Sequence, residues 1–198
     1  MATKEKAKKH MTPAGRLYYP YLNKPDTGKM YSDDKFKTGL IVKKEAVHKS
    51  GLLDEVKKFL AEHKLDINAA NYPIKDLASE DARAKKDFAS GEFADCYLIT
   101  AKSLFPVKLV DAKLNKVPEE IAEKIKGGDD AKIAFTMKFY TSNNKAIGKG
   151  VSFYLTDAQY IGENEAIGGG STPFGELEVV AEEEPSAEDS TDAFAEVA

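Results

Sequence analysis

Five stretches of the chain carry the signals of β-strands, and in three of them apolar and polar residues alternate as they do in half-buried strands. The second stretch is a clear example, because every other position from its second residue onward is suited to a core: Phe36, Thr38, Leu40 and Val42. Its other face begins with Lys35 and Lys37 and is therefore basic. These signals predict strands at residues 16–21, 35–43, 96–102, 132–141 and 150–161, the first of them rich in tyrosine and followed by turn-forming residues.

One helix is predicted between the second and third strands. Its apolar residues recur at helical spacing and form a single stripe made of Leu52, Leu53, Val56, Phe59 and Leu60. Ser50 is the candidate N-cap, and His63 and Lys64 lie near the end. The stripe predicts that this helix packs on the sheet.

Two further segments complete the predicted elements. A short helix is predicted after Pro118, with its end marked by Gly127 and Gly128. Residues 66–93 show no strong period, and we expect a long loop there.

The order of these elements favours a closed sheet over a parallel α/β fold, in which helices would follow nearly every strand. Two strands, a helix and three more strands suit a five-stranded, partly open barrel. We therefore expect a mainly β protein: an OB-fold-like barrel with one packed helix, a long loop insertion and a disordered acidic tail.

Charge divides the chain more sharply than its net value of −4 indicates. Residues 176–198 hold nine acidic residues and no Lys or Arg, which leaves 24 acidic against 29 basic residues before them. The body therefore carries a net charge of about +5. We expect a flexible basic arm at 1–13, an OB-fold-like domain at 14–175 and a disordered acidic tail at 176–198.

The acidic tail has two interpretations. It is a solvating, aggregation-resisting segment, or it covers a basic nucleic-acid groove when that groove is empty. For the second role, the candidate regulatory residues are Glu182, Glu183, Glu184, Glu188, Asp189, Asp192 and Phe194.

Residues that enzymes and metal sites require are isolated along the chain. The three histidines lack metal-ligand spacing and are expected at the surface, and the single cysteine, Cys96, is expected to be a buried apolar residue. Lys149 follows a glycine, but no Ser or Thr comes after it as a phosphate loop requires. We expect no enzymatic activity, no metal and no cofactor.

One enzymatic alternative remains open. The pairs Asp33-Asp34 and Asp129-Asp130 offer carboxylates for a metal-dependent nuclease, although both lie in turn-like contexts where Asp is common for backbone reasons. No apolar run approaches the roughly 18 residues that span a bilayer. We therefore expect no membrane contact and a location in the cytoplasm.

Aromatic and basic side chains share the polar faces of the predicted strands. Bases of a single-stranded nucleic acid stack on aromatic rings and its phosphates bind cations, so these faces favour such a ligand. Each outward tyrosine also has a structural interpretation, since tyrosines pack well across strands. The candidate DNA-binding residues are Arg16, Tyr18, Lys35, Lys37, Lys102, Lys132, Lys138, Tyr140, Lys149 and Tyr154.

Several short motifs occur in an order that resembles a bacteriophage family long described only as a domain of unknown function. They are Gly15-Arg16-Leu17-Tyr18-Tyr19, Lys37-Thr38-Gly39-Leu40-Ile41-Val42, Cys96-Tyr97-Leu98-Ile99-Thr100-Ala101-Lys102-Ser103, and Gly150-Val151-Ser152 leading to Gln159 and Gly168-Gly169. The resemblance spans residues 14–175. Members of the family are understood as OB-fold single-stranded-DNA-binding proteins with acidic tails.

The resemblance implies roles for particular residues. Residues 35–37 and 101–103 would lie near the DNA path, while Lys138, Tyr140 and Tyr154 would line the binding face. The tail departs from the family pattern, because many such tails end in an aromatic residue, whereas four residues follow Phe194 here.

The expected function is binding and protection of single-stranded DNA, without sequence preference, in phage replication and recombination. The tail would modulate DNA access and reach replication proteins, and duplex DNA would bind weakly. A homodimer is one of the oligomeric states left open. The alternative from another class is a non-enzymatic adaptor for phage replication or assembly proteins.

Overall fold

β-Strands dominate the computed structural model, which describes residues 7–28, 33–65, 72–78, 92–141, 148–165 and 167. All of these residues belong to one unit, Met1–Gly168. The strands are β1 Lys9–Met11, β2 Gly15–Tyr21, β3 Phe36–Lys43, β4 Ile74–Asp76, β5 Cys96–Ser103, β6 Lys108–Val110, β7 Asp130–Thr141 and β8 Lys149–Gly162. The helices are α1 Lys44–Lys49, α2 Leu52–Glu62 and α4 Glu119–Ala122.

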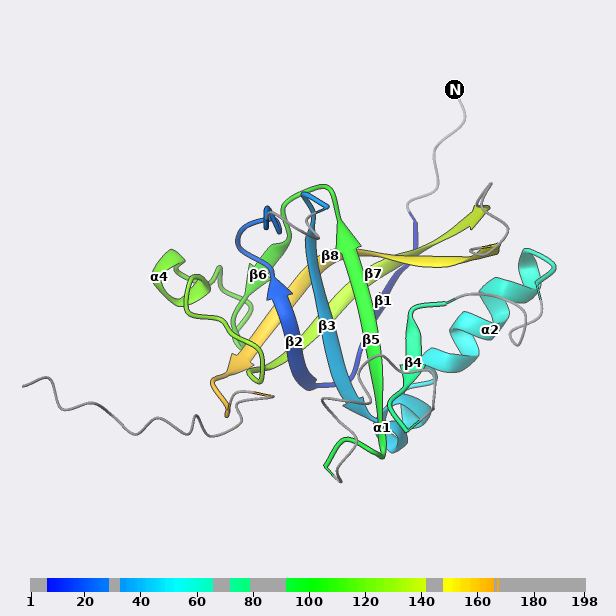
Figure 1. The fold of residues 1–198 in the computed structure, drawn as a ribbon, viewed down its shortest axis with the longest axis horizontal. Coiled ribbons are helices and arrows are strands. Elements are labelled where there is room, and N and C mark those ends of the chain that lie inside the picture. Colours follow the sequence, from blue (N-terminus) through cyan, green and yellow to red (C-terminus); the bar gives the residue numbers. More distant parts are fainter. Residues whose placement is uncertain are drawn as a thin grey trace, which may run out of the picture. The chain divides into compact units, whose positions relative to one another are not determined.

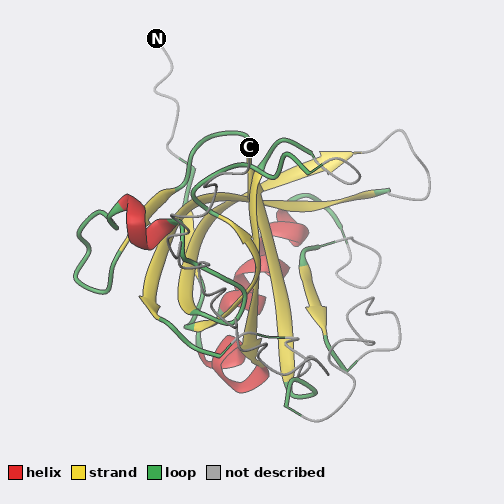
Figure 2. Ribbon diagram, turned by 60° about the vertical axis from the view of Figure 1, so that its left-hand side comes forward, coloured by secondary structure: helices red, strands yellow, loops and turns green. Residues whose placement is uncertain are grey.

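The sheet closes into a barrel because β7 pairs on both sides (Figures 1 and 2). Its strands follow the order β1-β7-β2-β3-β5-β8-β6. An additional pairing between β7 and β8 completes the ring. All pairs are antiparallel except β5 with β8 and β6 with β8. Since β1 and β2 share one edge of β7, and β5 and β6 share one edge of β8, the ring has five positions. This is the expected five-stranded OB-type barrel.

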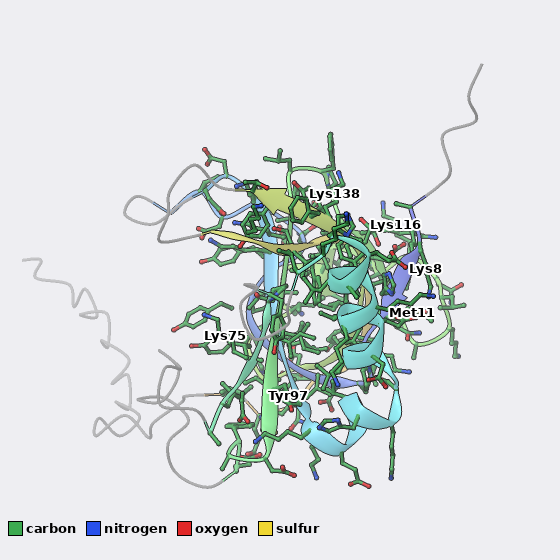
Figure 3. All side chains as sticks on the ribbon, turned by 90° about the vertical axis from the view of Figure 1, so that its right-hand side faces the viewer. Lys8, Met11, Lys75, Tyr97, Lys116 and Lys138 are labelled. Carbon is green, nitrogen blue, oxygen red and sulfur yellow. The ribbon has the colours of Figure 1, made fainter. Side chains whose placement is uncertain are left out.

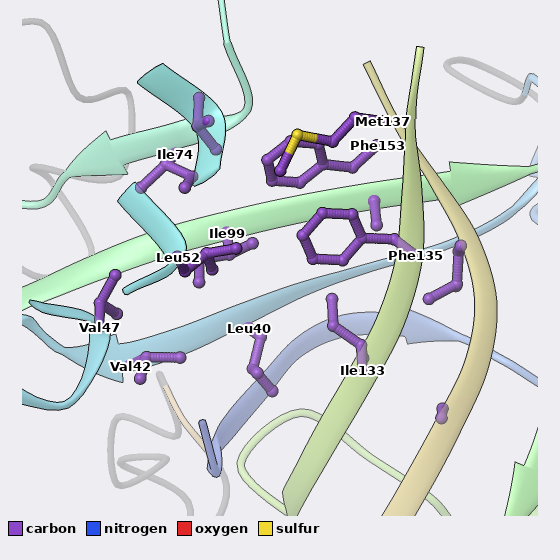
Figure 4. Close-up of a cluster of buried hydrophobic side chains, with 14 of the residues drawn as sticks. Leu40, Val42, Val47, Leu52, Ile74, Ile99, Ile133, Phe135, Met137 and Phe153 are labelled. Atoms are coloured by element: carbon purple, nitrogen blue, oxygen red, sulfur yellow. The ribbon is translucent and has the colours of Figure 1, made fainter. Parts of the chain in front are cut away.

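The barrel interior is filled by the alternate residues that the sequence pattern assigned to the core. Phe135 of β7 and Phe153 of β8 stack with their ring centroids 4.0 Å apart (Figure 4). Leu40 and Ile99 enter the same cluster from β3 and β5. Helix α2 closes it by inserting Leu52, Val56 and Leu60, so the prediction that this helix packs on the barrel is confirmed.

Some local expectations were wrong. Gly51, with φ +73°, stands at the N-cap of α2 in place of Ser50, whose hydroxyl instead accepts a hydrogen bond from the Leu52 amide at 3.3 Å. The insertion at 66–93 is not wholly a loop, because β4 pairs with β5 there. Strand β6 and helix α1 were not predicted.

A flexible basic arm was expected at residues 1–13, and this expectation is wrong for residues 9–11. These residues form β1, which pairs with Thr136, Phe135 and Ala134 of β7. His10, expected at the surface, is only 9% exposed and lies on Phe135. His48 and His63 are exposed as expected. The arm's first six residues and the acidic tail lie outside the described residues.

Side-chain contacts tie β1 to the barrel and to α2. Glu55 of α2 accepts hydrogen bonds from Lys8 and His10, each at 2.6 Å. Lys9 forms an ion pair with Asp157 of β8 at 2.7 Å. The hydrogen bond from Lys8, followed by that from His10, holds the pKa of Glu55 below its usual value. The Glu55 carboxylate therefore fastens β1 to α2.

We expect Glu55→Gln to lower the free energy of unfolding by about 1 kcal/mol at neutral pH, a modest value because the side chain is 39% exposed. A carboxyl group with a lowered folded pKa stabilises the fold above its ordinary pKa, about 4.3, and loses that contribution as the pH falls through the folded value. The difference between variant and wild type should therefore shrink in acid. Urea unfolding between pH 7 and pH 3 measures it.

Glu62→Gln is the matched control for this prediction, because Glu62 is exposed on the same helix. It should change the free energy of unfolding little at any of these pH values. An equal loss in both variants, or a Glu55→Gln effect that grows in acid, would contradict the role assigned to Glu55.

Candidate nucleic-acid interface

An open groove of about 700 Å³ runs over the outer faces of β3 and β5. Its floor comes from the residues opposite each other in that pair, with Lys37 facing Lys102 and Gly39 facing Thr100. Side chains alternate between the two faces of a strand. Because the neighbouring residues point into the barrel, these residues point outward. The groove thus lies on the outer surface of the barrel, over the paired strands β3 and β5.

Gly39 gives the groove its depth. A methyl group on this glycine would lie 2.9 Å from Leu98 and 3.2 Å from Tyr18, so a larger residue would displace one of them. The absence of a side chain lets Tyr18 of β2 pack across β3, directly opposite Gly39. Tyr18 therefore forms one wall of the groove.

Tyr19 reaches the same groove through a bulge. The β2–β3 register shifts between Tyr18 and Tyr21, and Tyr19 adopts a left-handed backbone with φ +46°. Its ring is 66% exposed and meets the Tyr18 ring edge-on, with the centroids 4.5 Å apart. An exposed aromatic at a bulge next to a groove is positioned to stack on a planar ligand.

The remaining walls come from the ends of other strands. Tyr140, near the end of β7, and Ser152 of β8 line one side. Lys75 of β4 and Tyr72, which precedes that strand, line another. Figure 3 shows Lys75 on the opposite side of the molecule from Met11 of β1 and from Lys8, which precedes that strand. The groove is therefore separate from the surface around β1.

Three lysines surround the acidic residue Asp33: Lys37 and Lys102 line the groove, and Lys35 lies beside it, outside the lining. Lys37 forms ion pairs with Asp26 at 2.6 Å and with Asp33 at 3.2 Å. Asp33 also lies 3.7 Å from Lys35 and 3.9 Å from Lys102. The hydrogen bond to Asp26 raises the pKa of Lys37, and that same bond lowers the pKa of Asp26. Lys37 is therefore firmly cationic.

A second group of predicted residues adjoins the groove across β8. Tyr154 is 38% exposed and pairs in register with Lys102, and the Lys138 ammonium lies 4.2 Å from the centroid of its ring. Figure 3 shows Lys138 on the long β7–β8 hairpin. Lys149 is exposed at the end of that hairpin, opposite Thr141. These side chains extend the basic and aromatic surface beyond the groove.

Two predicted site residues lie elsewhere. The Arg16 guanidinium donates hydrogen bonds to the Gly128 carbonyl, to Glu92 and to the Glu165 carbonyl, and packs 5.7 Å over the Phe93 ring. These contacts occupy Arg16 within the fold. Lys132 is exposed but pairs with Gln159, far along β7 from Tyr140.

Sequence reasoning missed four tyrosine or charged residues of the groove. They are Tyr19, Asp33, Tyr72 and Lys75. Tyr19 stands beside a predicted site residue, but its outward position depends on the bulge. Asp33 was considered only as a nuclease carboxylate. Tyr72 precedes β4 and Lys75 belongs to it, in a segment where no strand was predicted.

The nuclease alternative requires carboxylates that converge on a metal ion. In the part of the chain that the structure describes, no group of three or more His, Cys, Asp or Glu side chains could hold one. Asp129 is 1% exposed and accepts hydrogen bonds from the amides of Lys126 and Asn164, which is the expected backbone role of a turn aspartate. Cys96 is buried as expected, and burial raises the pKa of its thiol. None of the described helices is long and apolar enough to cross a membrane.

The fold is shared with solved structures of two phage proteins. A C-terminally truncated single-stranded DNA-binding protein from bacteriophage Enc34 matches with a TM-score of 0.62 and 19% identity, over 80% of this chain and 87% of that one. The same Enc34 protein in complex with single-stranded DNA matches with a TM-score of 0.59 and 21% identity, over 80% and 88%.

The second relative is gp2.5, a single-stranded DNA-binding protein encoded by bacteriophage T7. It matches with a TM-score of 0.56 and 18% identity, over 93% of this chain and all of that one. The expected OB-type architecture is thereby confirmed. No curated protein matches the chain in sequence.

One family profile covers nearly the whole sequence. It is described as the single-stranded-DNA-binding protein of Enterobacter phage Enc34, and it matches residues 8–190. The resemblance inferred from the short motifs is confirmed by this match, which also agrees with the expectation of a non-enzymatic protein. The chain therefore belongs to the Enc34 single-stranded-DNA-binding protein family.

Proposed function

We propose that this protein binds and protects single-stranded DNA, without strong sequence preference, during phage replication and recombination. The observation that carries the proposal is the groove on β3 and β5, which combines Lys37 and Lys102 with exposed tyrosine rings. In OB barrels, this pair of strands and the loops beside it form the usual oligonucleotide surface. The family to which the chain belongs supports the same ligand.

The mechanism follows from the two kinds of side chain. Phosphates bind along Lys35, Lys37 and Lys102, while bases stack on Tyr19 and Tyr140. A cation contacts any phosphate, and each base has an aromatic face, so neither interaction distinguishes sequence. The Lys138–Tyr154 pair extends the path over β8.

Fluorescence anisotropy with a labelled oligonucleotide tests the proposal. We expect tight binding to a single strand and weaker binding to the matching duplex. If about four phosphates are neutralised, the logarithm of the association constant should fall against the logarithm of salt with a slope near −3. Lack of binding at low salt would reject the function and favour the adaptor alternative.

Tyr140→Ala tests the stacking role directly. Loss of one stacked base costs about 1–3 kcal/mol, so we expect binding to weaken by roughly 5- to 150-fold. Tyr140→Phe keeps the ring and should bind nearly as the wild type does. Both variants should keep the wild-type melting temperature within a few degrees, because Tyr140 is only partly buried. Equal affinities in Tyr140→Ala and Tyr140→Phe would contradict base stacking at this position.

The acidic tail is part of the proposal. We assign residues 176–198 to competition for the basic groove and to binding of replication proteins in the host cell cytoplasm. A segment tethered to its own target competes at high effective concentration. Full-length protein should therefore bind DNA more weakly than residues 1–175, and equal affinities would leave the tail without this role. Sedimentation of both forms decides whether a homodimer forms.

A further inference from the structure

A carboxylate occupies the position in the groove where a phosphate is expected. Asp33 lies within 4 Å of three lysine ammonium groups: 3.2 Å from Lys37, 3.7 Å from Lys35 and 3.9 Å from Lys102. These lysines come from the approach to β3, from β3 itself and from β5. Asp33 thus links the cations of neighbouring strands as a bound anion would.

The position of Asp33 reduces the repulsion between two lysines of the groove. Lys37 and Lys102 face each other directly across the β3–β5 pair, and like charges in that relation repel. In the absence of DNA, the Asp33 carboxylate offsets this repulsion. A phosphate of a bound strand would need the same lysines.

Asp26 also pairs with Lys37, at 2.6 Å, but it has a structural role that Asp33 lacks. It is 8% exposed, and its carboxylate accepts a hydrogen bond from the Gly28 amide at 3.1 Å. Its backbone amide donates to the Lys35 carbonyl, so it holds the loop that leads into β3. Asp33 is about 30% exposed at the groove. Within the described residues, its carboxylate accepts no hydrogen bond from a backbone amide.

We propose that Asp33 is an intramolecular competitor of DNA phosphates, which sets the affinity of the groove by occupying Lys35, Lys37 and Lys102 when no strand is bound. This inference rests on the proposed function. When DNA binds, the carboxylate must leave the lysines or remain beside a phosphate, and both cost free energy. Removing its charge should therefore strengthen binding.

The test compares Asp33→Asn with Asp34→Asn in full-length protein, by anisotropy with a labelled single-stranded oligonucleotide at several salt concentrations. Asp34 is a matched control because it is the next residue, carries the same charge and lies outside the groove lining. Its backbone has φ +50°, a conformation that Asn also tolerates. Both variants change the net charge equally, so a nonspecific charge effect cancels.

We expect Asp33→Asn to bind roughly three- to tenfold more tightly than Asp34→Asn at low salt. This corresponds to the Coulomb repulsion between a carboxylate and a phosphate about 6 Å apart, at effective dielectric constants of about 40 to 80. The salt slope should steepen by about 0.7 if one additional phosphate is neutralised.

The outcomes separate the inference from the function on which it rests. If the wild type binds and Asp33→Asn binds no more tightly than Asp34→Asn, the competitor role is overturned. Weaker binding by Asp33→Asn would show instead that the carboxylate positions the lysines for DNA, which also overturns it. Absence of binding by the wild type and both variants would reject the proposed function together with the inference.

Discussion

Lys102→Glu is expected to weaken single-stranded DNA binding by roughly 10- to 100-fold at low salt. Lys102 stands where three strands meet, opposite Lys37 of β3 and in register with Tyr154 of β8, and its side chain is 57% exposed. A glutamate there removes one cation and repels phosphate. It also pairs with Lys37 directly across the sheet, so that a second cation is neutralised.

The size of this effect follows from the two lost charges. Each unit charge about 6 Å from a phosphate contributes on the order of 0.7–1.4 kcal/mol at effective dielectric constants of about 40 to 80, and two such changes multiply. The salt slope should become shallower by about 1.4, because two fewer phosphates are neutralised. Anisotropy titrations across salt concentrations measure both quantities.

The fold should not suffer from this substitution. A Glu–Lys pair across two strands is more favourable than two facing lysines, so the free energy of unfolding should stay equal or rise slightly. Lys58→Glu is the control: it makes the same charge change at an exposed position on α2, away from the groove lining. If Lys58→Glu weakened binding as much as Lys102→Glu, general charge and not the groove would attract the DNA.

The main strands could be predicted because alternation is a property of each strand alone. Residues 132–141 and 151–156 alternate, and the structure places them within the strands Asp130–Thr141 and Lys149–Gly162. The short strands could not be predicted in this way. Three residues, as in Lys9–Met11 or Ile74–Asp76, carry no measurable period and are strands only because a longer partner pairs with them.

The same distinction holds for the candidate site: features local to one strand could be predicted, and contacts between distant residues could not. Alternation correctly placed Lys37 on the outer face of its strand, and the family resemblance selected Lys102. Neither could show that the two lysines are opposite each other, since that depends on the register between distant strands. The sequence likewise could not show that Arg16 would find partners as remote as Glu92 and Gly128. Contacts between residues far apart in the chain decide whether an outward cation is available to a ligand.

Phe135→Ala should cost about 3–5 kcal/mol of the free energy of unfolding, the usual loss when a buried aromatic ring leaves a cavity. Phe135 is fully buried, stacks on Phe153 at 4.0 Å with the planes inclined by 14°, and also lies against His10. It stands in the middle of β7, the strand that pairs with β1, β2 and β8. The cavity would therefore weaken several parts of the ring together.

Urea unfolding followed by circular dichroism measures this loss, since the chain has no tryptophan to serve as a fluorescent probe. For a domain of this size, each kcal/mol lowers the melting temperature by about 2–4 °C, so a fall of roughly 6–20 °C is expected. Phe105→Ala removes the same ring from a loop position that is 76% exposed, and it should change stability little. Equal losses in the two variants would show that the Phe135–Phe153 stack is not the centre of the barrel. A large loss for Phe135→Ala alone, with DNA binding retained below the new melting temperature, would show that the core supports the groove without forming part of it.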